Sequence, residues 1–347
     1  MKPKQASITH SLLGTALGDS LGLPSEGMNR GRIAKRWKGD LEQRFLFGRG
    51  MLSDDTEHTI LSSQALLTCG GDATIFQKRL ASKLRWWFVG LPAGIGLATA
   101  KAIIKLWIGF PPGRNGVYSA GNGPVMRAPI LGVFFAHDKQ RREAFVEAST
   151  LLTHTDRKAV EAAMMAADCA AFATNREYRI DVILARMNQI AVAPEWRQPM
   201  EKIENALTRS ASVREFADDM GFSKGVSGYA VHTMTMVLFI WLRHREDFNR
   251  IVSEAISCGG DTDSVAAIAG GIAGAETDAF PPDWLNRLID RPYTVDYMNR
   301  LGAALGEASD GKRITPPTVA NYLIIPRNII FFITVLLHGF RRIFPPY

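Results

Sequence analysis

The sequence predicts an all-α protein, a compact multi-helix domain followed by a hydrophobic and basic C-terminal tail helix. Three observations favour this class. No window of alternating apolar and polar residues is long enough to require a β-strand. Hydrophobic residues make up 46% of the 347 residues, as in ordinary globular domains. Glycine (31 residues) and alanine are plentiful, which suits closely packed helices better than strands rich in β-branched residues.

The first predicted helix spans residues 7–23 and carries Gly14, Gly18 and Gly22 on one stripe. Each glycine costs about 1 kcal/mol of helix propensity relative to alanine. Three glycines in register therefore predict a very close neighbour, which is either the backbone of another helix or a ligand.

The other elements follow in order along the chain. Residues 109–124 contain three prolines and five glycines, and we expect them to form a loop. The apolar pattern predicts further helices at 53–69, 73–90, 141–153, 157–174, 178–191, 199–207, 226–243, 264–275 and from 280–285 onward. Prolines within 313–318 mark a linker. We therefore expect a helical domain over residues 1–309, and a linker with the tail over residues 310–347.

Charge and cysteine usage argue against several classes of function. The formal net charge is +7, but residues 311–347 hold five basic residues and no acid, so the body is nearly neutral and no nucleic-acid-binding face is expected. The cysteines Cys69, Cys169 and Cys258 are far apart, which argues against a disulfide framework or a thiolate zinc site. Asp19 interrupts the N-terminal apolar stretch, so we expect no export signal. A reducing, cytoplasmic location is expected.

Two acidic motifs stand directly before apolar helices. Each offers two carboxylates and a hydroxyl: Ser53, Asp54 and Asp55 in the first, Asp261, Asp263 and Ser264 in the second. Helix caps and first-turn acids have a similar composition, so capping alone is one explanation. Both motifs nevertheless hold more acids than a cap needs. Gly259 and Gly260 would also let the backbone adopt positive φ just before the second motif.

If the two motifs meet, four carboxylates share one site. Two like charges about 4 Å apart repel by about 4 kcal/mol at an effective dielectric constant of about 20, so such a group needs protons or a cation. Oxygen ligands without cysteine or histidine suit hard divalent ions, chiefly Mg²⁺, with Mn²⁺ or Ca²⁺ as alternatives. The spacing thus favours a metal site.

Four segments, taken together, resemble the ADP-ribosylglycohydrolase family, which includes the dinitrogenase reductase-activating glycohydrolases and the ADP-ribosyl-acceptor hydrolases. They are GTALGDSLGLPSEG (14–27), LSDDTEHT (52–59), SAGNGPVMRAPILG (119–132) with THTD (153–156), and CGGDTDSVAAIAGGIAGA (258–275). Their order and spacing match over about residues 8–290. The resemblance implies an all-α fold with two Mg²⁺ ions, or Mn²⁺, in a cleft. It also implies hydrolysis of the bond between ADP-ribose and a side chain of a modified protein, with arginine as the expected acceptor.

The resemblance also implies roles for single residues. The expected metal ligands are Ser53, Asp54, Asp55, Asp261, Asp263 and Ser264. The expected catalytic carboxylates are Glu26, Asp55 and Asp261, of which Glu26 gates the metal region or acts as a base. The residues expected to contact the substrate are Gly121, Asn122, Gly123, Met126 and His154. Pro124 stands where the family often has serine, which removes a donor and puts substrate contacts in doubt more than activity.

Several alternatives stay open. A family member that binds metal and ADP-ribose without turnover fits the same residues, and so does a hydrolase of a free ADP-ribosyl small molecule. His154 is either a substrate contact or a structural residue. Asp19 either serves the site or is a buried acid bonded to N–H groups. The expected partner is an ADP-ribosylated protein, and the sequence does not define an oligomeric state.

The tail, residues 321–347, lies outside the resemblance and combines Ile-, Phe- and Leu-rich stretches with arginines. Its clean apolar stretch, residues 329–337, is shorter than the ~20 residues that a membrane span needs. We therefore expect an interfacial anchor that contacts anionic lipid at the inner face of the membrane. Docking of the tail on the body or a partner subunit, and a true span, are the alternatives.

Overall fold

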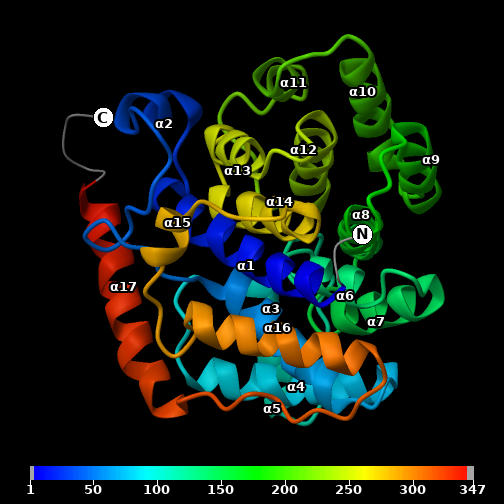
Figure 1. Cartoon of the computed structure of the whole chain (residues 1–347), viewed down its shortest axis with the longest axis vertical. Helices are drawn as coiled ribbons and strands as arrows, with labels where there is room; N and C mark the ends of the chain where they lie inside the picture. Colours follow the sequence, from blue (N-terminus) through cyan, green and yellow to red (C-terminus); the bar gives the residue numbers. More distant parts are fainter. Residues whose placement is uncertain (1–3, 342–347) are drawn as a thin grey trace.

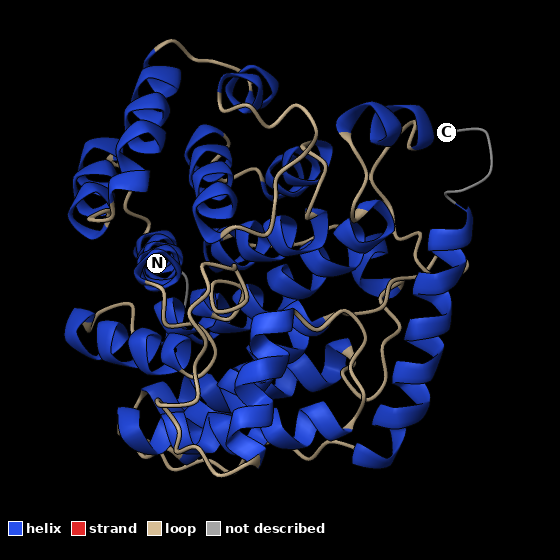
Figure 2. Cartoon of the chain, turned by 180° about the vertical axis from the view of Figure 1, so that it is seen from behind, coloured by secondary structure: helices blue, strands red, loops and turns tan. Residues whose placement is uncertain are grey.

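The computed structural model describes residues 4–341, and over that range it contains helices and isolated bridge pairs but no β-strand (Figures 1 and 2). The α-helices in chain order are α1 (Lys4–Gly22), α2 (Arg30–Arg36), α3 (Asp54–Thr68), α4 (Ala73–Val89), α5 (Leu97–Trp107), α6 (Ala128–Phe134), α7 (Lys139–Leu151), α8 (Arg157–Asn175), α9 (Ile180–Ile190), α10 (Arg197–Thr208), α11 (Val213–Asp219), α12 (Ala230–Arg243), α13 (Phe248–Ser257), α14 (Thr262–Glu276), α15 (Pro282–Asn286), α16 (Val295–Ser309) and α17 (Ile324–Arg341). Three short 3₁₀ helices span Leu23–Ser25, Pro194–Trp196 and Asn321–Leu323. The predicted all-α class with an apolar C-terminal helix is confirmed.

A pair of closely packed helices, α1 and α14, lies at the centre of the molecule (Figure 1). The glycine stripe of α1 makes this approach possible, since a Cβ atom on Gly18 would collide with the backbone carbonyl of Ala266. A Cβ atom on Gly22 would lie 2.6 Å from the Cα atom of Asp263. The close neighbour that the stripe predicts is therefore a helix backbone. The contact also carries the second acidic motif to the end of α1.

The remaining core helices pack around this pair. Helices α3, α6 and α16 pack on α1, whereas α8, α12 and α13 pack on α14. The sequence analysis did not predict α2, α5, α6, α11, α13 or α16. Because α3 follows the first acidic motif and packs on both central helices, both motifs point into the same part of the fold.

The tail helix α17 is docked along one side of the body, opposite α9 and α10 (Figures 1 and 2). Its inner face is buried at Arg327, Asn328, Phe331 and Thr334. The Asn328 side chain donates to the carbonyl of Gly90 (2.7 Å). The structure therefore shows the docking on the body that the sequence left as an alternative.

The outer face of α17 is apolar and exposed. Residues 321–340 have a mean hydropathy of 1.8. By length and composition alone, this segment could cross a membrane. The exposed large apolar residues of this segment are Tyr322, Ile325, Ile329, Ile330, Phe332, Ile333, Leu336, Leu337 and Phe340. Contact of this face with a membrane stays a prediction, and so do the domain limits at residues 309 and 310.

Candidate active site

The start of α3 is fixed by two side chains. Ser53 caps the helix, since its hydroxyl oxygen accepts from the N–H of Asp55 (3.2 Å). Asp19 of α1 accepts from the N–H groups of Ser53 (2.9 Å) and Thr56 (3.2 Å). Burial raises the pKa of Asp19 to about 6, although the hydrogen bonds from Thr56 and Ser53 oppose the shift. Asp19 is thus a buried acid bonded to N–H groups, and it ties α1 to the first acidic motif. Its second oxygen has no hydrogen-bond partner, so service to the site stays a prediction.

The start of α14 is fixed by two glycines in the left-handed region. Gly259 has φ 71° and Gly260 has φ 82°, as the sequence predicted. The N–H of Gly260 donates to the carbonyl of Met28 (2.7 Å), and the N–H of Gly27 donates to the carbonyl of Gly260 (2.7 Å). These bonds bring the loop that carries Glu26 alongside the second acidic motif.

The two acidic motifs meet in the structure. The hydroxyl of Ser264 donates to Oδ2 of Asp55 (3.2 Å), a contact between residues 209 positions apart. The same oxygen lies 3.2 Å from the hydroxyl of Ser53, which donates to it. Asp55 and Asp263 are buried, and Asp261 is half-buried. Capping alone would not require this convergence.

The convergence leaves carboxylates buried against one another. The pKa values of Asp54, Asp55 and Asp263 are raised well above the usual range, first by burial and then by neighbouring acids. Among the neighbouring acids, Asp19 raises the pKa of Asp54 most. Asp54 in turn raises the pKa of Asp55 most, and Glu26 raises that of Asp263 most. Glu26 itself is exposed, so the cluster has a buried floor and an open rim.

The chemistry of this cluster fits a hard cation, although its arrangement is not that of a preformed metal site. Within residues 4–341, no group of three or more His, Cys, Asp or Glu side chains is arranged to hold a metal ion. One carboxylate oxygen on each of Asp19, Asp55 and Asp263 is buried without a hydrogen-bond partner. Unpartnered anionic oxygens beside serine hydroxyls are the donors that Mg²⁺ and Mn²⁺ accept. The donor set therefore fits, and the ligand roles stay a prediction.

The predicted substrate loop lies against the second motif. The side-chain amide of Asn122 donates to Oδ2 of Asp261 (2.7 Å) and to the hydroxyl of Thr233 (3.1 Å). A Cβ atom on Gly121 or Gly123 would lie 3.0 Å from the ring of His154. The structure therefore brings Gly121, Asn122, Gly123 and His154 together beside Asp261.

Two of the predicted substrate residues are more enclosed than the sequence suggested. His154 is buried, and burial together with Arg127 lowers its pKa to about 3, so its ring is neutral at physiological pH. The side chain of Met126 packs in the hydrophobic core, while its carbonyl accepts from the hydroxyl of Thr59 (3.1 Å). The contacts of both residues with substrate stay predictions.

Arg127 organises the same loop, and the sequence analysis did not single it out. Its buried guanidinium donates to the carbonyl of Gly123 (3.0 Å) and to the hydroxyl of Thr153 (2.8 Å), and it lies 3.1 Å from Nδ1 of His58. Burial lowers the pKa of Arg127 to about 9. The available signal was its position at the end of the segment GNGPVMR, residues 121–127.

The fold and the site define an all-α protein with a buried cluster of carboxylates and hydroxyls beside a glycine-rich loop. The chain belongs to the ADP-ribosylglycohydrolase family, whose family model matches residues 2–313. It is 24% identical over 287 residues to an ADP-ribosyl-[dinitrogen reductase] glycohydrolase of Rhodospirillum rubrum, covering 80% of this chain and 88% of the relative.

Two further comparisons agree. An ADP-ribosylarginine hydrolase, Tri1, of Pseudomonas putida is 26% identical over 321 residues, covering 84% of this chain and 80% of the relative. A solved ADP-ribosylglycohydrolase-related protein complex matches with a TM-score of 0.68 and 25% identity, covering 89% of this chain and all of that chain. Family membership supports an ADP-ribosyl hydrolase activity.

Proposed function

We propose that the chain is a Mg²⁺-dependent hydrolase that removes ADP-ribose from a modified protein, with arginine as the acceptor side chain. The observation that carries the proposal is the hydrogen bond between Ser264 and Asp55, because it joins the two acidic motifs in one site. The names of the relatives, which act on ADP-ribosylated dinitrogen reductase and on ADP-ribosylarginine, support the substrate class.

The proposal gives each part of the site a task. Ser53, Asp54, Asp55, Asp261, Asp263 and Ser264 would hold the ions, as the resemblance implies. A bound ion of this kind supplies Lewis-acid polarisation and lowers the pKa of water. Asn122 orients Asp261 through its 2.7 Å hydrogen bond. Gly121 and Gly123 carry no Cβ atom, so the loop lies close against the ring of His154, and it would contact the diphosphate of ADP-ribose.

The reaction itself is a hydrolysis at the anomeric carbon of ADP-ribose. A water oxygen bonds to this carbon, and the bond to the acceptor nitrogen breaks with its electron pair staying on the nitrogen. The acceptor then takes up a proton from solvent, and the carboxyl group that received the water proton returns it to solvent. Glu26, at the exposed rim beside Asp263, takes the proton of the attacking water. Asp55, which is buried, and Asp261, which is half-buried, would hold the reacting groups in place.

The test is release of ADP-ribose from ADP-ribosylarginine with Mg²⁺ present. We expect release by the wild type, and loss of release with EDTA or in Asp263→Ala. Asp72→Ala is the matched control, because Asp72 only caps α4 through the N–H of Ile75 (2.8 Å), and it should keep the activity. Binding of ADP-ribose without release would instead identify a binding protein. A panel of acceptor linkages and free ADP-ribosyl molecules tests the arginine assignment.

We also propose that the protein acts in the cytoplasm and contacts the inner face of the membrane peripherally. Three free, buried cysteines suit a reducing compartment. The exposed apolar face of α17 supports the membrane contact. Because Arg327 and Asn328 hold the inner face of the helix on the body, α17 would lie on the membrane surface rather than cross it.

A further inference from the structure

A cation from the tail helix reaches the back of the first acidic motif. The guanidinium of Arg327 is buried and donates to Oε1 of Glu57 (2.9 Å) and to Oδ2 of Asp290 (2.7 Å). It also donates to the carbonyl of Leu52. The second oxygen of Glu57 accepts from the indole N–H of Trp87 (2.6 Å). One side chain of α17 thus contacts α3 and the loop before α16, and Glu57 links it to Trp87 of α4.

These contacts hold the segment that leads into the first acidic motif. The carbonyl of Leu52 accepts from Arg327, and its N–H donates to Oδ2 of Asp290 (2.9 Å). The next N–H, that of Ser53, donates to Asp19 of α1 (2.9 Å). The backbone at residues 52–53 is therefore fixed from one side by the core and from the other side by the tail.

Charge balance makes Arg327 hard to replace. Glu57 and Asp290 are both buried, and Arg327 is the cation that forms ion pairs with them among the described residues. Loss of one partner from a buried ion pair leaves a charge without compensation in a medium of low dielectric constant. A lysine would supply the charge but not the fork of donors that reaches two carboxylates and a carbonyl at once.

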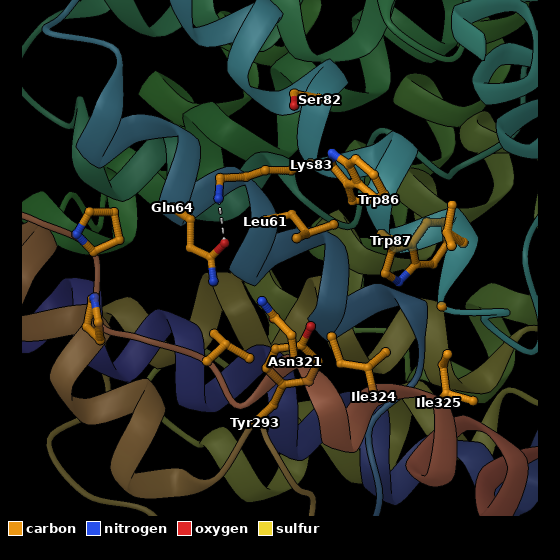
Figure 3. Close-up of a pocket in the computed structure, with 15 residues that line it drawn as sticks. Leu61, Gln64, Ser82, Lys83, Trp86, Trp87, Tyr293, Asn321, Ile324 and Ile325 are labelled. Atoms are coloured by element: carbon orange, nitrogen blue, oxygen red, sulfur yellow. Dashed lines mark hydrogen bonds between the residues drawn. The ribbon is translucent and has the colours of Figure 1, made fainter.

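A cavity lies beside the start of the tail helix. A cavity of about 560 Å³ separates the segment 316–325 from α4. Figure 3 shows Trp86 and Trp87 on one side of this cavity, with Ile324 and Ile325 on the other. Beside this cavity, the hydrogen bonds of Arg327 and Asn328 tie the helix to Glu57 of α3 and to the carbonyl of Gly90.

We propose that Arg327 is a positioning residue for the metal site, through which the tail holds Ser53, Asp54 and Asp55 where they meet Ser264. The family model matches residues 2–313, and α17 begins at Ile324. The side chain that positions the first acidic motif therefore comes from a helix outside the matched region. The inference rests on the proposed function, because it assumes that the acidic motifs bind Mg²⁺ or Mn²⁺.

The test measures binding of Mg²⁺ and of Mn²⁺ to the full-length chain by isothermal titration calorimetry without substrate, together with the thermal midpoint. Wild type, Arg327→Met, Arg327→Lys and His338→Phe are compared. His338→Phe is the control, since it removes a tail contact to the carbonyl of Phe45 (2.7 Å), seven positions before Leu52, and leaves the hydrogen bonds of Arg327 in place. We expect Arg327→Met to weaken metal binding about tenfold or more, as for loss of a residue that orients metal ligands. We expect His338→Phe to keep the affinity within about twofold and to lose less thermal midpoint than Arg327→Met, which leaves two buried acids without their cation.

The outcomes separate this inference from the proposed function. If the wild type binds neither Mg²⁺ nor Mn²⁺, the proposed metal site is wrong, and the proposed Mg²⁺-dependent function is wrong with it. If the wild type binds but Arg327→Met binds equally well, or weakens no more than His338→Phe, the positioning role is wrong. Where Arg327→Met does not fold, Arg327→Lys decides, because a folded lysine variant with wild-type affinity overturns the role and one with reduced affinity supports it.

Discussion

Arg127 is the residue that gives the substrate loop its shape. The guanidinium is fully buried and reaches the carbonyls of Gly123 and Ser149 as well as the hydroxyl of Thr153. A loop of glycines has little stiffness of its own, since glycine populates both signs of φ. Residues 120–122 are held by backbone bonds to residues 228–230, and Arg127 holds the next carbonyl, that of Gly123.

Replacement of Arg127 by methionine should destabilise the fold and weaken ADP-ribose binding. The change keeps the length of the side chain but leaves the carbonyls of Gly123 and Ser149 buried without a donor. Each such group costs about 1–3 kcal/mol, so we expect a loss of about 3 kcal/mol in unfolding free energy by urea titration. Arg114→Met, at an exposed arginine, is the control. Equal stability of the two variants would contradict the role of Arg127.

Two buried histidines should make the protein sensitive to acid. The pKa of His154 is lowered to about 3, and that of His58 is lowered well below the usual value, in both cases by burial and then by Arg127. The unfolded chain, with a histidine pKa of about 6.5, binds the proton more readily, so stability falls as the pH drops from about 6.5 toward 3.

For His154 alone, this linkage amounts to about 2 kcal/mol between pH 7 and pH 5. Urea titrations at several pH values measure how the free energy of unfolding falls as the pH drops. This fall should be smaller in His154→Asn than in the wild type. His137→Asn, at an exposed histidine, should leave the decline unchanged. A decline that is the same in all three proteins would show that His154 is not held neutral.

The contact between α1 and α14 depends on the absence of side chains along one stripe. Gly18→Ala should be strongly destabilising, because the new Cβ would collide with the carbonyl of Ala266 in a buried backbone that cannot move aside. Gly31→Ala in α2 is the control, since its nearest neighbour would be the Asn29 side chain at 3.5 Å. Thermal unfolding should show a large loss of stability for Gly18→Ala. For Gly31→Ala it should show a gain of up to about 1 kcal/mol in the free energy of unfolding. A Gly18→Ala protein as stable as the wild type would refute the steric argument.

The sequence predicts helices well where capping and burial agree, and less well elsewhere. The starts of α3 and α14 follow the serine and the paired glycines that marked them. Helix α13 was missed, although its buried residues Phe248, Ile251, Val252 and Ala255 are spaced as on one helical face. Pro326 stands in the first turn of α17, where proline is tolerated, so the helix begins before the apolar stretch 329–337.

The membrane contact of α17 can be tested without removing the tail, which would also remove Arg327. Ile333→Glu places a charge on the outer face, where Ile333 is 50% exposed, and leaves the docking face intact. We expect the wild type to sediment with anionic liposomes and Ile333→Glu to remain in the supernatant. Leu97→Glu, at a residue of α5 that is 70% exposed, is the control. Equal soluble fractions of all three proteins would remove the membrane contact.

At the scale of the whole molecule, divalent ions should stabilise the fold. The raised pKa values of Asp54, Asp55 and Asp263 show that burial of these acids opposes their charged forms, and a cation relieves this repulsion in the folded state only. Mg²⁺ at about 100 times its dissociation constant should add about 2.7 kcal/mol to the free energy of unfolding. Thermal unfolding with Mg²⁺, compared with NaCl at equal ionic strength, measures the gain. No gain in the wild type, or the same gain in Asp263→Ala, would contradict metal binding at this cluster.

Much of the candidate site was predictable because its parts lie in short segments with distinctive composition. The acidic motifs and the glycine loop were expected to converge, and the contacts of Asp55 with Ser264 and of Asn122 with Asp261 bring them together. Arg327 could not be predicted in the same way, because no local pattern connects it with Glu57, which lies 270 residues earlier in the chain. Its partners depend on how the tail folds back.

The pairing of α1 with α14 also has a consequence for biosynthesis. Helix α1 packs on a helix that ends at Glu276, so its glycine stripe stays uncovered while the more than 200 residues between α1 and α14 are translated. Partial nascent chains therefore lack the central contact of the native protein. Chaperones that shield α1 during elongation should raise the yield of native enzyme.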